Sequence, residues 1–155
     1  MATVAIAATG FGAGMANAYS FKEAAVTAKD GSATVASATT KMEHGYSSLS
    51  GNIFHKGVMT IRDRSAGDGR AVYGKLTGQK WDYVVQRRPG GSIKYLAWIG
   101  TGQKETSRTS STLSTVPTVS WDYRTHYGLK TFTNVCVDIR LQPDNCAGIS
   151  ATTLY

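Results

Sequence analysis

Three histidines, His44, His55 and His126, are the residues of this chain best suited to general acid–base catalysis or metal binding. None stands in a His-x-x-x-His pair, and none accompanies a serine in a nucleophile-elbow motif. The carboxylates are few, although Asp82 and Asp122 would face each other if their strands paired. These types and spacings favour structural histidines, and we expect a protein that is not an enzyme.

Aspartates and glycines at residues 63–69 suggest a calcium-binding loop. The alternating Asp-x-Asp-x-Asp-Gly pattern and the distant bidentate Glu of such loops are absent from the sequence. Asp63 and Asp68 are better explained as turn residues that accept hydrogen bonds from their own backbone. No Gly-rich phosphate-binding loop precedes a helix either, so the sequence predicts no metal and no cofactor.

The two cysteines, Cys136 and Cys146, lie ten residues apart with Pro143, Asp144 and Asn145 between them to turn the chain. Neither Cys-x-x-Cys spacing nor a Cys/His metal set is present, which favours a disulfide over two free thiols. Closing so short a loop would stabilise the fold by about 2.5–3 kcal/mol in the chain-entropy estimate. A disulfide indicates an oxidising compartment.

Residues 1–18 carry no charged side chain, and Ala16-Asn17-Ala18 places small residues where a signal peptidase requires them. They are similar to the apolar half of a secretory signal peptide that lacks its positive n-region, with the mature chain beginning at Tyr19. The segment is too short and too rich in glycine to span a bilayer. We expect a secreted, extracellular protein without a transmembrane segment. If the segment is retained, we expect an apolar tail docked on a partner subunit.

Positive charge is concentrated in the middle of the chain. The sequence has 17 Lys and Arg against 10 Asp and Glu, a net charge of +7, and residues 56–108 hold eleven of those bases but four of the acids. Strands that shared one basic face would attract an anionic partner. The candidate residues for that surface are Arg62, Arg64, Arg70, Lys80, Arg87, Arg88 and Lys94. The alternative, which we favour, is an ordinary soluble basic surface.

Arg87 and Arg88 accompany Tyr83 and Tyr95, a mixture of basic and aromatic residues that nucleic-acid-binding surfaces also use. A solvated basic strand end with its tyrosines in the core explains the same residues more simply. We therefore do not expect nucleic acid as a partner.

Short alternating segments between turn residues predict a mainly β fold. Alternation at 58–62, a turn cluster at 63–69 and a return strand at 71–73 predict a hairpin. The other expected strands are 81–86, 93–99, 119–123 and 134–141, with Pro89-Gly90-Gly91 as a turn and a long loop or weak edge strand over 100–115. This spacing predicts an all-β domain, a single β-sandwich or barrel over residues 41–155.

Residues 19–40 are ambiguous between a helix and strands. Ser20 and Glu23 form a capping-box pair in front of several alanines, which favours a helix that ends at Gly31. Residues 26–27 and 33–36 are equally typical of strands. We treat the segment as an N-terminal arm, extended or in a short helix, that precedes the β domain.

The run Asn134-Val135-Cys136-Val137-Asp138, followed by Gln142-Pro143-Asp144-Asn145-Cys146, resembles the ending of small secreted proteins of Streptomyces and related actinobacteria. Residues 61–73, IRDRSAGDGRAVY, are similar to the mid-chain hairpin D-x-x-x-x-D-G-x-x-V-Y of those proteins. Some of them resemble non-enzymatic adaptor subunits of secreted antibacterial toxin assemblies. Such adaptors are small β domains that join a lectin-like subunit to a larger toxin chain through an inserted N-terminal segment.

The resemblance implies a non-catalytic secreted adaptor that binds another protein subunit by adding a strand from its arm to a partner's sheet edge. The candidate interface residues in this arm are Tyr19, Phe21, Val26 and Val35. Two other functions remain open: a bacteriocin-like toxin that acts on anionic surfaces through the basic segment, and a structural subunit of a virion or filament.

Overall fold

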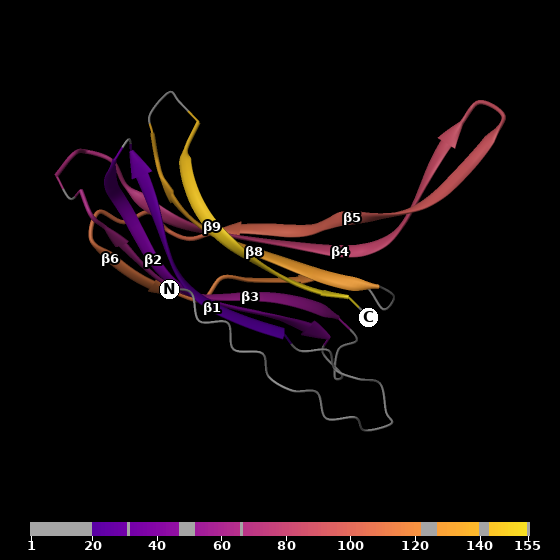
Figure 1. Cartoon of the computed structure of the whole chain (residues 1–155), viewed down its shortest axis with the longest axis horizontal. Coiled ribbons are helices and arrows are strands. Elements are labelled where there is room, and N and C mark those ends of the chain that lie inside the picture. The colour runs from indigo at the N-terminus through magenta and orange to yellow at the C-terminus, as the bar shows by residue number, and fades with distance from the viewer. Residues whose placement is uncertain are drawn as a thin grey trace, which may run out of the picture.

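The computed structural model describes residues 20–30, 32–46, 52–65, 67–121, 127–139 and 143–154. These residues form strands and connecting turns, with no helix among them. The strands are β1 (Ser20–Asp30), β2 (Ala33–Tyr46), β3 (Ile53–Asp63), β4 (Val72–Arg88), β5 (Gly91–Glu105), β6 (Thr112–Thr115), β7 (Thr118–Trp121), β8 (Gly128–Val137) and β9 (Asn145–Leu154). Two antiparallel sheets pack face to face (Figure 1), which confirms the predicted all-β sandwich.

The five-stranded sheet has the order β1-β2-β3, with both β6 and β7 paired to the far edge of β3. The four-stranded sheet has the order β5-β4-β8-β9. At one side of the sandwich the two sheets approach each other where β1 lies against β9, and Lys22 Nζ donates a hydrogen bond to the Ser150 carbonyl at 3.1 Å.

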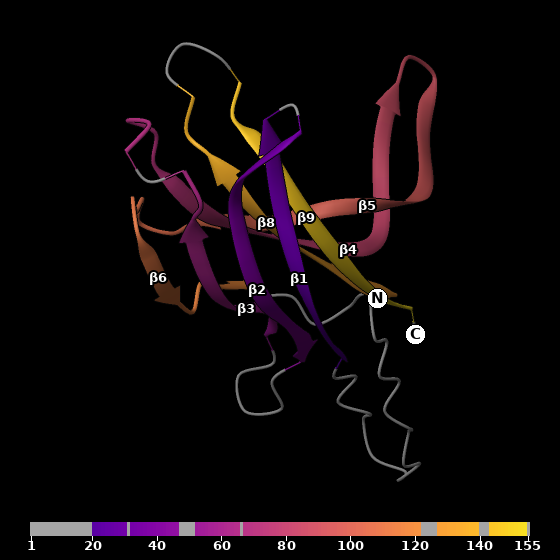
Figure 2. The same ribbon diagram turned by 60° about the vertical axis from the view of Figure 1, so that its left-hand side comes forward.

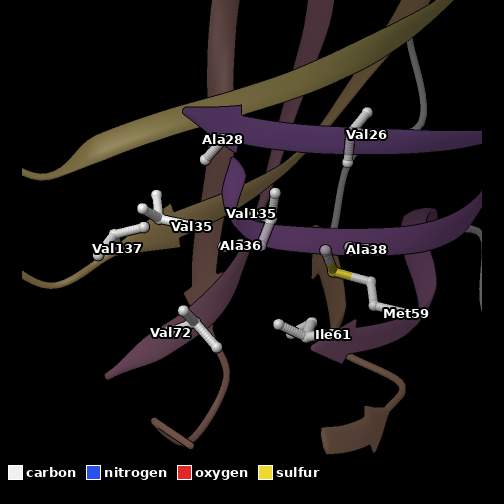
Figure 3. Close-up of a cluster of buried hydrophobic side chains, with 10 residues drawn as sticks. All are labelled: Val26, Ala28, Val35, Ala36, Ala38, Met59, Ile61, Val72, Val135 and Val137. Carbon is white, nitrogen blue, oxygen red and sulfur yellow. The ribbon is translucent and has the colours of Figure 1, made fainter. Parts of the chain in front are cut away.

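The core forms because alternate residues of each strand point inward. Along β3, for example, Ile53, His55, Gly57, Met59 and Ile61 are buried, whereas the residues between them are more exposed. Figure 3 shows the main apolar cluster, which consists of Val26, Ala28, Val35, Ala36, Ala38, Met59, Ile61, Val72, Val135 and Val137. Most of these side chains are small, so the backbones of the two sheets can approach closely.

Residues 20–40 are not a separate arm, and the prediction of an arm or helix is wrong for them. Ser20–Asp30 and Ala33–Tyr46 are adjacent strands of the five-stranded sheet, paired from Ser20–His44 to Asp30–Ala33. Val26 and Val35 lie in the core cluster. Burial on alternate positions of β1 therefore outweighs the helix propensity of its alanines. Tyr19 lies outside the described residues.

The hairpin predicted for residues 58–73 is also wrong. Both of its strands exist, but β3 pairs with β2, β6 and β7, whereas β4 pairs with β5 and β8 in the other sheet. Residues 64–71 carry the chain from one sheet to the other. Turn residues indicate that the chain changes direction, but they do not specify which sheet receives the next strand.

The longest strands, β4 and β5, extend beyond the sandwich. β4 pairs with β8 only as far as Trp81, opposite Gly128, but it pairs with β5 up to Arg88, opposite Gly91. We call the two-stranded part, residues 82–97, the ribbon. Both views show it projecting from the sandwich (Figure 1 and Figure 2). The predicted turn at 89–91 closes it, with Gly90 at φ 91°, a left-handed conformation that favours glycine.

Candidate functional site

The ribbon carries the most exposed cluster of large apolar side chains in the described residues. Val85 is 59% exposed, Tyr95 44%, Ile93 43%, Tyr83 41% and Leu96 38%. Clustered exposure of this kind marks interaction surfaces, whereas single exposed apolar residues are common on any protein. A two-stranded ribbon is also only marginally stable by itself in water. The ribbon is therefore the candidate binding surface of this chain.

One face of the ribbon continues the face of the four-stranded sheet that packs on the other sheet. In the sandwich, the inward face of β4 includes Leu76, which is fully buried. The same face continues to Val84, opposite Tyr95, and to Ile93, opposite Gln86. Ile93 and Tyr95 are exposed because the five-stranded sheet does not extend beneath the ribbon. We call this surface the inner face of the ribbon.

A buried ion pair stands where the ribbon leaves the sandwich. Lys80 Nζ lies 2.8 Å from Asp82 Oδ2, with both side chains less than a tenth exposed. Asp82 Oδ1 also accepts a hydrogen bond from the Tyr83 amide at 2.7 Å. Because both charges are buried, each compensates the other, and removal of either would leave an unpaired buried charge. Lys80 was predicted to belong to a surface for anionic partners, and this prediction is wrong.

The opposite face of the ribbon, its outer face, presents alternating aromatic and basic side chains. The Lys94 ammonium lies 4.1 Å from the centre of the Tyr83 ring, and Tyr83 meets Tyr127 edge to face at 5.5 Å. Trp81 and Trp98, paired across β4 and β5, are 5.2 Å apart. Tyr83 was expected in the core, and so was Tyr95 on the inner face, yet both are exposed.

The basic residues predicted to share one surface fall into two groups. Arg87, Arg88 and Lys94 are exposed near the tip of the ribbon. At the opposite end of β4, Arg64 Nε donates to Ser37 Oγ at 2.9 Å, and Arg70 forms an ion pair with Asp30 at 2.8 Å.

Arg62 is exposed on β3, in the five-stranded sheet. The prediction of one shared basic face is therefore wrong, because the two groups are separated by the length of the sandwich.

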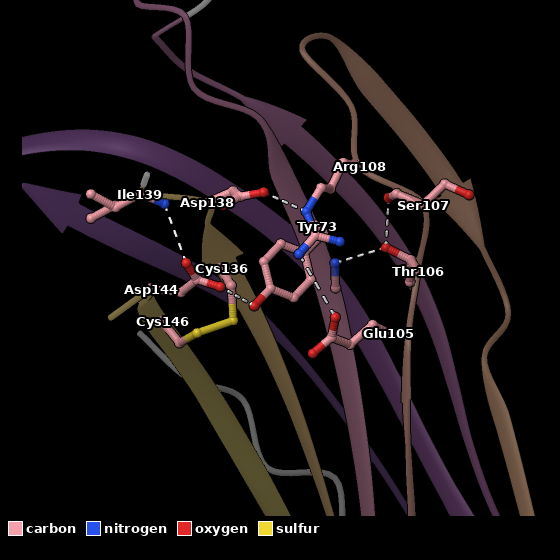
Figure 4. Close-up of polar contacts among 11 residues, drawn as sticks. Tyr73, Glu105, Thr106, Ser107, Arg108, Cys136, Asp138, Ile139, Asp144 and Cys146 are labelled. Carbon is pink, nitrogen blue, oxygen red and sulfur yellow. Dashed lines mark hydrogen bonds and ion pairs between the residues drawn. A yellow bond between two sulfur atoms is a disulfide. The ribbon is translucent and has the colours of Figure 1, made fainter. Parts of the chain in front are cut away.

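The predicted disulfide between Cys136 and Cys146 is confirmed, and it links β8 to β9 as directly paired residues. Figure 4 shows a polar clamp beside it. Tyr73, next to Cys136 in the sheet, donates its hydroxyl to Asp144 at 2.5 Å, and Arg108 covers the Tyr73 ring at 4.5 Å.

This hydrogen bond to Asp144 lowers the pKa of that carboxyl, and the Ile139 amide adds to the effect. Burial, together with the same bond, raises the pKa of the Tyr73 hydroxyl. Arg108 also pairs with Asp138. These groups therefore hold the segment after β8 against β4, and their role is structural.

His44 and His55 are buried and form a polar seam inside the sandwich. The Nδ1 atoms of His44 and His55 lie 2.9 and 2.7 Å from the same Thr131 hydroxyl, and His44 Nε2 lies 3.0 Å from Thr153 Oγ1. Burial lowers the pKa of His44 to about 4, so its ring is neutral at physiological pH. His126 and Asp122 lie outside the described residues.

The aspartates of residues 63–69 act as turn residues. Asp63 accepts a hydrogen bond from the Ser65 amide and Asp68 from the Arg70 amide, each at 2.8 Å. Among the residues that the structure describes, no cluster of His, Cys, Asp or Glu has the arrangement of a metal site.

Sequence reasoning missed Trp98, Leu96, Tyr127 and Lys130 as surface residues. The signal that could have identified the ribbon is the presence of apolar residues at both odd and even positions of 93–99, next to a strong turn. That pattern also fits a strand buried on both faces, so the sequence alone does not separate the two cases.

No protein-family model matches this chain, and no curated protein matches it either. The resemblance to small secreted actinobacterial proteins therefore stays a prediction. Within the described part of the chain, no helix has the length and apolar character to cross a membrane.

Proposed function

We propose that this chain is a non-catalytic binding protein that attaches to a partner protein through the inner face of the ribbon. The observation that carries the proposal is the exposure of Ile93 and Tyr95 on a face that is core elsewhere in the same sheet. A partner with an apolar surface would complete the sandwich at this point, where the chain's own second sheet ends. Arg88, on the inner side of the tip, favours acidic groups at the edge of that surface.

Within the adaptor hypothesis, our proposal assigns the role of the arm to the ribbon. Residues 20–40 are part of the sandwich, so they cannot insert into a partner without opening it. The ribbon is a projecting β element in the described residues and suits the same kind of attachment. His44, Asp63, Asp68 and Asp144 all make structural contacts, which supports a role in binding rather than catalysis.

A structural subunit of a virion or filament is the second candidate function, and the strand edges of the ribbon favour it. Between Asp82 and Arg88, β4 pairs with β5 alone among the described strands, and β5 is the edge strand of its sheet. Exposed edges of this kind can pair with another copy of the same chain.

We also propose that the protein works in an oxidising, extracellular compartment, because disulfides persist there. Intact-mass measurement on protein from its natural source tests this. A mass two hydrogens below that of the reduced chain supports the proposal, and two free thiols would refute it.

The attachment is tested by two matched double variants made in the organism that produces the protein. Ile93→Lys with Tyr95→Lys places two charges on the inner face of the ribbon, and Ala25→Lys with Thr27→Lys places two on exposed positions of β1. We expect the first to lose the protein that co-purifies with the wild type and the second to keep it. Both should unfold at the wild-type temperature, because all four side chains are exposed.

A photocrosslinking amino acid at position 95 identifies what lies against the inner face. A crosslink to a different protein supports the binding-protein proposal, and a crosslink to a second copy selects the structural subunit. No adduct, or a crosslink only to residues of the same chain, would refute both.

A further inference from the structure

The outer face of the four-stranded sheet carries a continuous line of aromatic and basic side chains from the sandwich into the ribbon. Phe132 and Lys130 of β8 lie opposite Thr77 and Gln79 of β4, on the face turned away from the core. Trp81, Tyr83 and Val85 follow on the same face of β4. Trp98, Leu96 and Lys94 lie opposite these three on β5. We call this line the outer strip.

The members of the outer strip are in contact with one another. The Lys130 ammonium lies 4.8 Å from the Phe132 ring centre and 5.7 Å from that of Trp98. Trp98 contacts Trp81 at 5.2 Å. Further along, Lys94 lies over Tyr83, and Tyr127 packs edge to face against the same ring. Flat rings thus alternate with cations along the strip.

The strip has positive charge, and Glu105, an exposed acid on the same side of the sheet, lies beyond its end, opposite Lys75. Residues 83–104 include no Asp or Glu. Their bases Arg87 and Lys94 lie on the face of the strip, whereas Arg88 and Lys104, opposite Gly91 and Leu76, lie on the inner side. None of these bases, nor Lys130, takes part in an ion pair in the described residues. Asp82, which lies between Trp81 and Tyr83 in the sequence, is buried with Lys80 on the other side of the sheet. The strip is therefore complementary to an anionic ligand that has flat faces.

Because Tyr83 is exposed and not in the core, contrary to the expectation from sequence, we propose that the outer strip binds single-stranded nucleic acid. Bases would stack on the rings of Trp98 and Tyr83, and phosphates would pair with Lys94, Lys130 and Arg87. A lysine that lies over a ring can pair with a phosphate while the base takes its place on the ring face. This inference goes beyond the proposed attachment, because it uses the opposite face of the ribbon and leaves Ile93 and Tyr95 free for a protein.

The length of the strip fits such a ligand. From Thr77, opposite Phe132, to Val85, opposite Lys94, β4 advances eight residues, or about 26 Å at a rise of about 3.3 Å per residue. Sequence-independent sites of this kind hold about four nucleotides or more.

Binding is measured by fluorescence anisotropy with a fluorescein-labelled oligo(dT) of about 20 nucleotides and an oligo(U) of equal length. Three phosphate contacts predict a slope of log K against log salt of about −2, so binding weakens about 15-fold between about 50 and 200 mM salt. Stacking on Trp98 should quench tryptophan fluorescence, and Trp98→Phe should remove most of that quenching while retaining binding.

Matched charge variants locate the site. Lys94→Gln with Lys130→Gln and Arg62→Gln with Arg64→Gln each remove two positive charges, the first from the outer strip and the second from the five-stranded sheet and the link that follows it. We expect the first pair to flatten the salt slope by about 1.4 and the second to leave it unchanged.

Three results would overturn the proposal. They are equal effects of the two pairs of variants, binding without tryptophan quenching, and equal binding of heparin or of duplex DNA. Each would show attraction to polyanions in general without a stacking site.

Discussion

Acid should destabilise this protein through His44, whose ring is fully buried in the polar seam. Burial lowers the pKa of His44 in the folded protein from 6.5 to about 4. As the pH falls below 6.5, the unfolded chain binds the proton first, so the free energy of unfolding decreases until the folded protein also binds it near pH 4. At 1.36 kcal/mol per pKa unit, the difference amounts to about 3 kcal/mol in full.

The contribution of His44 is separated from that of other titrating groups by comparison with His44→Gln. Glutamine can hydrogen-bond to the same threonines but does not titrate. Urea unfolding of both proteins at about pH 7.5 and about pH 5 gives their difference in stability at each pH. We expect the wild type to lose about 2 kcal/mol more than the variant between these values. An equal loss in the two proteins would show that the folded state does not hold His44 neutral, and would refute this reasoning.

Three further predictions concern stability. Gly78→Ala would place a Cβ 2.3 Å from the buried ring of His55, so it should lower the free energy of unfolding in urea by about 1–3 kcal/mol. Gly100→Ala, whose Cβ would have no atom within 4 Å, should not cause such a loss. Lys80→Met should lower the free energy of unfolding by about 3–5 kcal/mol, because it leaves the buried charge of Asp82 unpaired. Adding Asp82→Leu should restore most of that stability, and a double variant less stable than the single one would contradict this explanation. Cys136→Ser should lower stability by about 2.5–3 kcal/mol, and the wild-type protein treated with a reductant provides the independent comparison.

The parts of the fold that were predictable from sequence are those in which local patterns determine the structure. Trp81, Tyr83 and Val85 stand at alternate positions, with the polar Asp82 and Gln86 at the opposite parity, and they share one face of β4 as expected. The spacing of Cys136 and Cys146 around a turn was sufficient to predict their bond. The all-β class followed from many such segments together.

Sequence reasoning could not predict which parts of each strand are covered by the opposite sheet. Tyr95 occupies a position with the pattern of a buried strand, but the second sheet ends before it reaches this residue. Tyr83 is exposed for a different reason, because it lies on the outer face of the ribbon, turned away from the second sheet. Val26 and Val35 show the reverse, because partners distant in the sequence, Val135 and Val137, cover them. Exposure depends on tertiary contacts, so residues expected in a free arm are buried, and residues expected in the core are exposed on the ribbon.

The polar seam also bears on how the two sheets are aligned. Small aliphatic side chains form smooth surfaces, and one sheet could slide along the other with little change in contact energy. The bonds of His44 and His55 to Thr131, and of Thr40 to Thr133, cross from one sheet to the other and are directional. A shift of one residue pair would break all of them at once and leave buried polar atoms unsatisfied. The seam thus selects a single alignment from several that the aliphatic residues alone would permit.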